Sequence, residues 1–116
     1  MNAHDYERAV NYYLDAEALF SGDPSLDLAL ANNLGNAYRE LGRFSEALER
    51  FRRARDIAET LDSPLLELRI LNNLAALYAD FERYDDAKLI VDNALAIADS
   101  TGATQWSRFL WGVRAA

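Results

Sequence analysis

The chain of 116 residues is long enough for one domain with a modest core, and 51% of its residues are hydrophobic. Its formal net charge of -7 means that its surface repels phosphate backbones, which disfavours nucleic acids and anionic membranes as partners. The chain has no cysteine, no basic and apolar leader, and no apolar run near the roughly 20 residues that span a bilayer, so we expect a cytoplasmic protein without disulfides.

Apolar residues recur at helical spacing along nearly the whole chain, which predicts an all-α protein. In chain order, the expected helices cover residues 5–20, 24–41, 44–61, 64–81 and 84–100, followed by a short segment at 103–116. The turns between them carry recognisable chemistry. Gly22 suits a left-handed helix end, Asp23 can cap the next helix, and Pro24 fits its first turn. Ser63-Pro64 repeats this start, and Gly42-Arg43 predicts a tight turn.

The sequence repeats itself with a spacing of forty residues. Residues 31–38 return as 71–78, and residues 41–47 return as 81–87. Self-similarity at such a period is typical of a solenoid, in which each copy buries the apolar face of its neighbour. We therefore expect antiparallel helix pairs, five to six helices in all, stacked on one another; the right-handed superhelix that we also expect is implied by the family resemblance given below.

Small residues occupy positions that indicate close helix packing. Gly35 lies in the middle of an expected helix, where glycine costs about 1 kcal/mol relative to alanine. A glycine tolerated there predicts close approach by a neighbouring helix. Ala47 and Ala87 follow the aromatic residues Phe44 and Tyr84 near the start of the partner helix. The pattern predicts small residues packed against large ones, which is core architecture and not chemistry.

Arginines concentrate in one expected helix, at Arg50, Arg52, Arg53 and Arg55. Each has an acidic residue four positions away, the spacing of ion pairs on a helix surface. The pairs at this spacing are Glu46–Arg50, Glu49–Arg53, Arg52–Asp56 and Arg55–Glu59. A solvated, self-paired face is therefore favoured over a phosphate site.

Residues that could carry catalysis or bind a metal are scarce. His4 is the only histidine and has no second ligand near it in the sequence. Asp85 and Asp86 are adjacent, so on a helix they point about 100° apart and are better explained as favourable charges at a helix start. No glycine-rich phosphate loop or nucleophile motif is present. We expect no enzyme activity, no cofactor and no metal.

The two copies resemble the tetratricopeptide repeat. The residues that carry the resemblance are Leu34-Gly35, Tyr38, Gly42, Phe44, Ala47, Phe51 and Ala54 in one copy, and Leu71, Leu74-Ala75, Tyr78, Tyr84, Ala87, Val91 and Ala94 in the other. The forty-residue spacing resembles the longer-repeat branch of kinesin light chains and bacterial peptide-sensing regulators. The resemblance implies one domain with repeats at 23–62 and 63–102, the second helix of a preceding repeat at 5–20, and a capping or partial helix at 103–116.

That resemblance implies a non-enzymatic scaffold, in which the first helix of each repeat lines a concave groove for an extended peptide or helix of a partner protein. The groove residues that it implies are Asn32, Asn33, Asn36, Arg39, Arg69, Asn72 and Asn73. An asparagine amide donates and accepts hydrogen bonds, so it can bind a peptide backbone of any sequence. The alternative is that asparagines brace neighbouring helices, and this weighs most for Asn33 and Asn73.

The two ends of the chain suggest a different role. The first expected helix has an apolar face with no helix before it, and the last segment carries Trp106, Phe109 and Trp111. Repeat arrays usually end on a polar capping face. The chain is therefore either part of a longer array or a module that forms a homo-oligomer through its end helices. The alternative is that Trp106, Phe109, Leu110 and Val113 simply cover the fifth expected helix.

Overall fold

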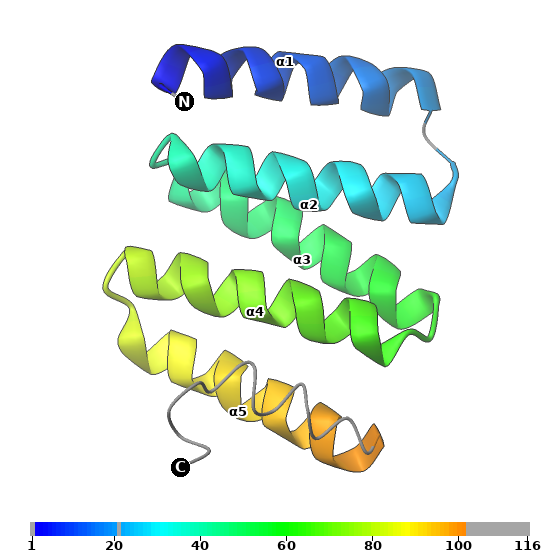
Figure 1. Ribbon diagram of the computed structural model, residues 1–116, viewed down its shortest axis with the longest axis vertical. Helices are drawn as coiled ribbons and strands as arrows, with labels where there is room; N and C mark the ends of the chain where they lie inside the picture. Colours follow the sequence, from blue (N-terminus) through cyan, green and yellow to red (C-terminus); the bar gives the residue numbers. More distant parts are fainter. Residues whose placement is uncertain (1, 21, 102–116) are drawn as a thin grey trace. The chain divides into compact units, whose positions relative to one another are not determined.

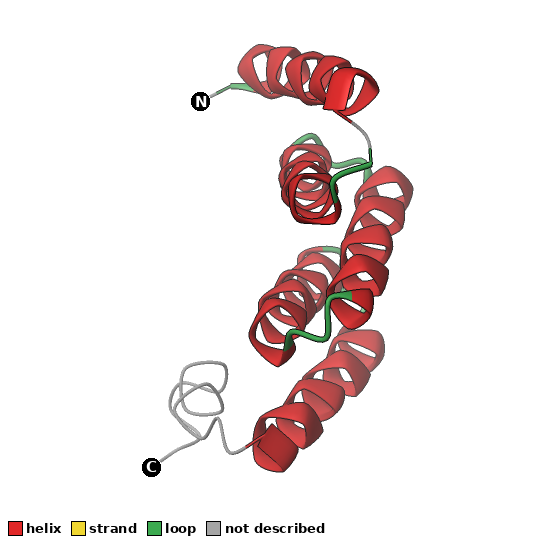
Figure 2. Ribbon diagram, turned by 90° about the vertical axis from the view of Figure 1, so that its right-hand side faces the viewer, coloured by secondary structure: helices red, strands yellow, loops and turns green. Residues whose placement is uncertain are grey.

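The computed structural model describes residues 2–20 and 22–101, and this part of the chain forms five α-helices joined by short turns (Figures 1 and 2). The helices are α1 (Ala3–Phe20), α2 (Pro24–Glu40), α3 (Phe44–Thr60), α4 (Pro64–Asp80) and α5 (Tyr84–Thr101). They are packed as sequential antiparallel pairs, which confirms the predicted all-α class. Each end lies within two residues of its expected position, and the segment 103–116 lies outside the described residues.

Contacts divide the chain into two compact units, Met1–Asp62 and Ser63–Ala116. In the first unit, α2 packs against both α1 and α3. In the second unit, α4 packs against α5. The expected division into repeats and the right-handed superhelix stay predictions.

Helices α2 and α4 begin with the capping chemistry that the sequence predicts. The backbone N–H groups of Ser25 and Leu26 donate to the carboxylate of Asp23 at 3.0 and 3.4 Å. In α4, the N–H of Leu66 donates to the hydroxyl of Ser63 at 3.4 Å. Each cap residue is followed by a proline, whose missing N–H costs nothing in the first turn.

Helix α2 ends in a turn that depends on a left-handed residue. Gly42 has a φ of 75°, and its N–H donates to the carbonyl of Arg39 at 3.0 Å. The N–H of Arg43 donates to the carbonyl of Tyr38 at 2.9 Å. This pair of bonds is the Schellman motif, which satisfies carbonyls that the helix leaves without partners.

Helix α4 ends in the same turn but without a glycine. The N–H of Glu82 donates to the carbonyl of Ala79 at 3.0 Å, and that of Arg83 donates to Tyr78 at 2.8 Å. Glu82 has a φ of 61°, although it carries a side chain. Glu82 lies forty residues after Gly42. Both repeats therefore have the same left-handed turn, but in the second repeat the left-handed residue has a side chain and its backbone is strained.

The contact between α2 and α3 is closest at Gly35. A Cβ atom at this position would lie 2.6 to 2.8 Å from three carbons of the Phe51 ring, closer than carbon atoms can approach. This confirms the predicted close approach of a neighbouring helix. The residues forty positions later are Ala75 and Val91. Alanine is larger than glycine by one methyl group, and valine is smaller than phenylalanine.

We expect Gly35→Ala to destabilise the protein by about 1–2 kcal/mol, because overpacking against Phe51 outweighs the better helix propensity of alanine. Phe51→Val alone should cost about 2 kcal/mol through lost burial. The double variant reproduces the Ala75–Val91 combination, so its loss in denaturant unfolding should be smaller than the sum of the single losses by at least about 1 kcal/mol. Strictly additive losses would contradict this account of the contact.

At the turns, we expect Glu82→Gly to raise the free energy of unfolding by about 0.5–1 kcal/mol, because glycine adopts the left-handed region without strain. Gly42→Ala is the matched opposite change and should cost about 1 kcal/mol. Nothing lies within 4 Å of a Cβ at Gly42, so its effect reports backbone strain alone. Thermal or denaturant unfolding measures the change in stability of each variant. If Glu82→Gly and Gly42→Ala changed stability in the same direction, backbone strain at these two turns would be refuted as the cause.

Candidate functional site

Helix α2 places three of the predicted groove residues on one side, which we call the α2 row. Asn32, Asn36 and Arg39 lie at intervals of four and three residues, so their side chains project from the same face of the helix. All three are half-buried. Among the described residues, the side-chain amide of Asn36 has no hydrogen-bond partner in the protein. That amide can therefore bind a ligand without first breaking an internal contact.

Helix α4 carries two more of the predicted groove residues, Arg69 and Asn72, which we call the α4 row. Arg69 and Asn72 are both exposed, and neither side chain forms a hydrogen bond or ion pair within the described part of the chain. Leu65, one turn earlier on the same side, is 52% exposed. The α4 row thus offers a cation, an amide and an apolar side chain within three turns of helix.

Asn33 and Asn73 occupy equivalent positions next to these rows. Each follows the first asparagine of its repeat, and both are half-buried. Since adjacent residues on a helix point about 100° apart, these two amides do not project in the direction of Asn32 and Asn72. Their assignment to the ligand-facing set stays a prediction, as does that of the two rows.

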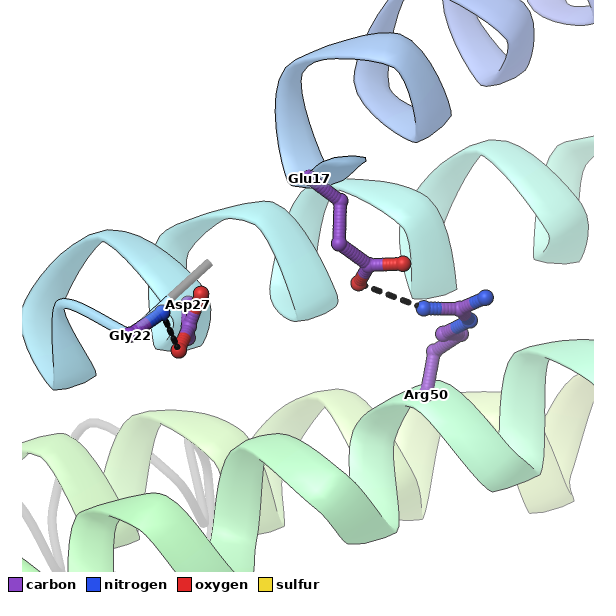
Figure 3. A network of polar contacts seen from close by, with 4 residues as sticks. All are labelled: Glu17, Gly22, Asp27 and Arg50. Carbon is purple, nitrogen blue, oxygen red and sulfur yellow. Dashed lines mark hydrogen bonds and ion pairs between the residues drawn. The ribbon is translucent and has the colours of Figure 1, made fainter. Parts of the chain in front are cut away.

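The arginine-rich helix α3 differs from expectation at Arg50. Its guanidinium group lies 2.7 Å from the carboxylate of Glu17 on α1, not beside Glu46 (Figure 3). The two side chains are only 21% and 23% exposed, so water screens the pair weakly. Glu46 instead lies 3.8 Å from Arg43. The interaction therefore joins α1 to α3, where the sequence pattern predicted a bond within one helix.

Of the other ion pairs expected within α3, one forms and two do not. Arg55 and Glu59 lie 3.5 Å apart, which confirms that prediction. Arg52 and Arg53 are both exposed, and in residues 2–20 and 22–101 neither forms an ion pair. The prediction of a fully self-paired face is therefore wrong for these two, because helical spacing permits a pair without requiring it.

Sequence reasoning missed Asp27, the one buried charged residue of the described core. One carboxylate oxygen accepts a hydrogen bond from the N–H of Gly22 at 3.2 Å, which links the turn to the first part of α2 (Figure 3). Its other oxygen has no partner in the described structure. An acid so close to the N-terminus of a helix is favoured by the helix dipole, and this was the available signal.

The described residues contain no cluster of acidic or histidine side chains that could hold a metal ion. His4 is exposed on α1, and Asp85 and Asp86 are exposed in the first turn of α5. In the same part of the chain, no helix is long and apolar enough to cross a membrane. Trp106, Phe109 and Trp111, the predicted self-association residues, lie outside the described residues.

Comparison with known proteins identifies one family. A profile of the tetratricopeptide repeat matches residues 1–60 and, in a second overlapping match, residues 26–100. No curated protein and no solved structure gave a match. The two matches together cover residues 1–100, which is all of α1 to α4 and all but the last residue of α5. The longer-repeat branch suggested by the forty-residue spacing stays a prediction.

The Glu17–Arg50 pair makes a prediction about how α1 is held. In a double-mutant cycle with Glu17→Gln and Arg50→Gln, we expect a coupling energy of roughly 1 kcal/mol, at the upper end for such pairs because both side chains are mostly buried. The control cycle uses Arg43 and Glu46, which are 47% and 52% exposed and should couple by roughly 0.3 kcal/mol or less. Equal couplings in the two denaturant-unfolding cycles would show that burial does not strengthen the first pair.

Proposed function

Because the chain belongs to the tetratricopeptide repeat family, we propose that it is a non-catalytic scaffold that holds an extended peptide or a helix of a partner protein through side chains of the α2 row and the α4 row. Repeats of this family generally mediate protein–protein interactions. The observation that carries the proposal is that the same helix of each copy carries amide and guanidinium groups. They are Asn32, Asn36 and Arg39 in the α2 row and Arg69 and Asn72 in the α4 row, and of these Asn32 and Asn72 lie forty residues apart.

The chemistry of the rows fits a peptide main chain. The amide of Asn36 or Asn72 donates to a peptide carbonyl and accepts from a peptide N–H, so each residue can bind the backbone whatever the ligand sequence. Selectivity then comes from Arg69, which favours an acidic side chain, and from Leu65, which favours an apolar one. The α2 row and the α4 row each bind a separate segment of the partner protein.

Self-association is the second candidate, and exposed apolar side chains on α1 favour it. Tyr12 is 71% exposed and Leu19 is 76% exposed. They lie seven residues apart, so they project from one side of the helix. An exposed apolar row of this kind is a common feature of protein interfaces. Under this alternative the occupant is a second copy of the chain.

A random-peptide display selection against the immobilised chain tests the main proposal. We expect Asn36→Ala together with Asn72→Ala to weaken the selected peptides by at least about tenfold, because each lost hydrogen bond costs about 0.5–1.5 kcal/mol. Asn11→Ala is the control, since Asn11 is exposed on α1 outside both rows.

Peptides that bind the double variant as tightly as the wild type would contradict the assignment of the rows. If no peptide is enriched and the chain sediments as a dimer, self-association replaces peptide binding as the preferred function. Circular dichroism of each variant checks that the helices are retained.

A further inference from the structure

Helix α1 carries an exposed line of side chains, which we call the α1 stripe. It consists of Arg8, Tyr12, Asp15 and Leu19, which follow one another at intervals of four, three and four residues. At about 100° per residue, these four side chains project within about 60° of one another. All four are exposed, whereas Val10 on the opposite side of the helix is buried. Helix α1 therefore packs against α2 with one face and leaves the α1 stripe open to solvent (Figure 1).

The two charges of the α1 stripe have no partner within the described part of the chain. Neither Arg8 nor Asp15 forms an ion pair or a hydrogen bond there. Asp15 has no basic residue three or four positions away on the helix. Arg8 has Asp5 three positions before it, but a carboxylate oxygen of Asp5 accepts the backbone N–H of Asn2 at 3.3 Å instead. Both charges of the stripe are therefore available to a group from another molecule.

The order of residues along the α1 stripe is self-complementary. Arg8 and Asp15 lie seven residues apart, about 10 Å along the helix axis, and Tyr12 lies between them. When a second copy of α1 lies antiparallel to the first, with a two-fold axis beside Tyr12, Arg8 of each copy faces Asp15 of the other. In a parallel pair, Arg8 would face Arg8 and Asp15 would face Asp15, which is repulsive. The charges therefore favour one occupant, a second copy, and one orientation.

The apolar members of the stripe supply the attraction between the two copies. Tyr12 is 71% exposed, although its ring lies edge-on to that of Tyr13 with the centroids 5.8 Å apart, and Leu19 is 76% exposed. In the antiparallel pair the two Tyr12 rings cover each other, and Leu19 lies against His4 and the aliphatic stem of Arg8 from the other copy. Exposed ion pairs contribute little free energy, so they set the orientation while the burial of Tyr12 and Leu19 drives association.

We propose that α1 is a homodimer interface, in which the α1 stripes of two copies pair antiparallel about a two-fold axis at Tyr12. This inference rests on the self-association candidate and deepens it, and it uses neither the α2 row nor the α4 row. Contact through one helix face is smaller than the roughly 800 Å² per partner of a stable interface. We therefore expect a weak dimer, with a dissociation constant of about 10–100 µM.

Exchange of charge tests the pairing, with sedimentation of the full chain over a range of concentrations as the readout. Arg8→Asp brings two acidic stripes together and Asp15→Arg brings two basic ones together, so each variant alone should dimerise at least about tenfold more weakly than the wild type. An equal mixture of the two variants should form a heterodimer, because an acidic stripe then meets a basic one. The double variant Arg8→Asp/Asp15→Arg should restore the homodimer, since the same ion pairs form with their residues exchanged.

The matched control for charge is Arg69→Asp, which makes the same change on α4. Its dissociation constant for the dimer should stay within about twofold of the wild-type value, because a charge outside the interface is screened by salt. Circular dichroism establishes that each variant remains helical.

Disulfide cross-linking tests the orientation, because the chain has no cysteine of its own. Tyr12→Cys places two thiols beside the two-fold axis, where a mild oxidant should join them. Leu19→Cys is the control, since Leu19 is as exposed as Tyr12 but the two copies of position 19 lie fifteen residues, about 22 Å, apart along an antiparallel pair. A parallel pair would cross-link through both positions.

Three outcomes would overturn the inference. If the chain stays monomeric at about ten times the expected dissociation constant, the self-association candidate fails with it. If Arg8→Asp and Asp15→Arg dimerise as tightly as the wild type, self-association stands but the α1 stripe is not its interface. If Leu19→Cys cross-links as readily as Tyr12→Cys, the pair is not antiparallel. None of these variants except the Arg69→Asp control alters the α2 row or the α4 row, so the peptide selection reports on the main proposal separately.

Discussion

The close contact between Gly35 and the ring of Phe51 is the constraint on which the first unit depends. It fixes how near α2 and α3 can lie, because any side chain at Gly35 would enter the space of the ring. The distance between these helices in turn determines which faces of α2 and α3 point outward. The half-buried α2 row and the exposed side of α3 that carries Arg52 and Arg53 are therefore positioned by the pairing of small and large residues between the helices.

Local structure was largely predictable because local chemistry decides it. The caps at Asp23 and Ser63, the left-handed conformation of Gly22 and the tight turn at Gly42 depend on a few neighbouring residues, and the structure has each as expected. The approach of a helix to Gly35 was also predictable, since a mid-helix glycine needs a packing reason. What the sequence could not supply was the identity of Phe51 as the residue in contact.

The ionic contacts were less predictable, because they depend on tertiary packing. Arg50 has Glu46 at helical spacing, yet its partner is Glu17, thirty-three residues away on α1. Position along one helix cannot reveal such a pair, since it requires knowing how α1 packs. For the candidate site, the family resemblance implied the two rows on α2 and α4. The structure adds that Arg69 and Asn72 are exposed, that Asn36 is half-buried, and that these three side chains have no partner in the described part of the chain.

The difference between Gly42 and Glu82 has a consequence for folding kinetics. Both residues must enter the left-handed region before the helices on either side can meet. The unfolded chain visits that region readily at a glycine and seldom at a glutamate. Loop closure is otherwise equally short in the two helix pairs, so the nucleation barrier is lower for α2 and α3. We therefore expect this pair to form first and the pair of α4 and α5 to follow.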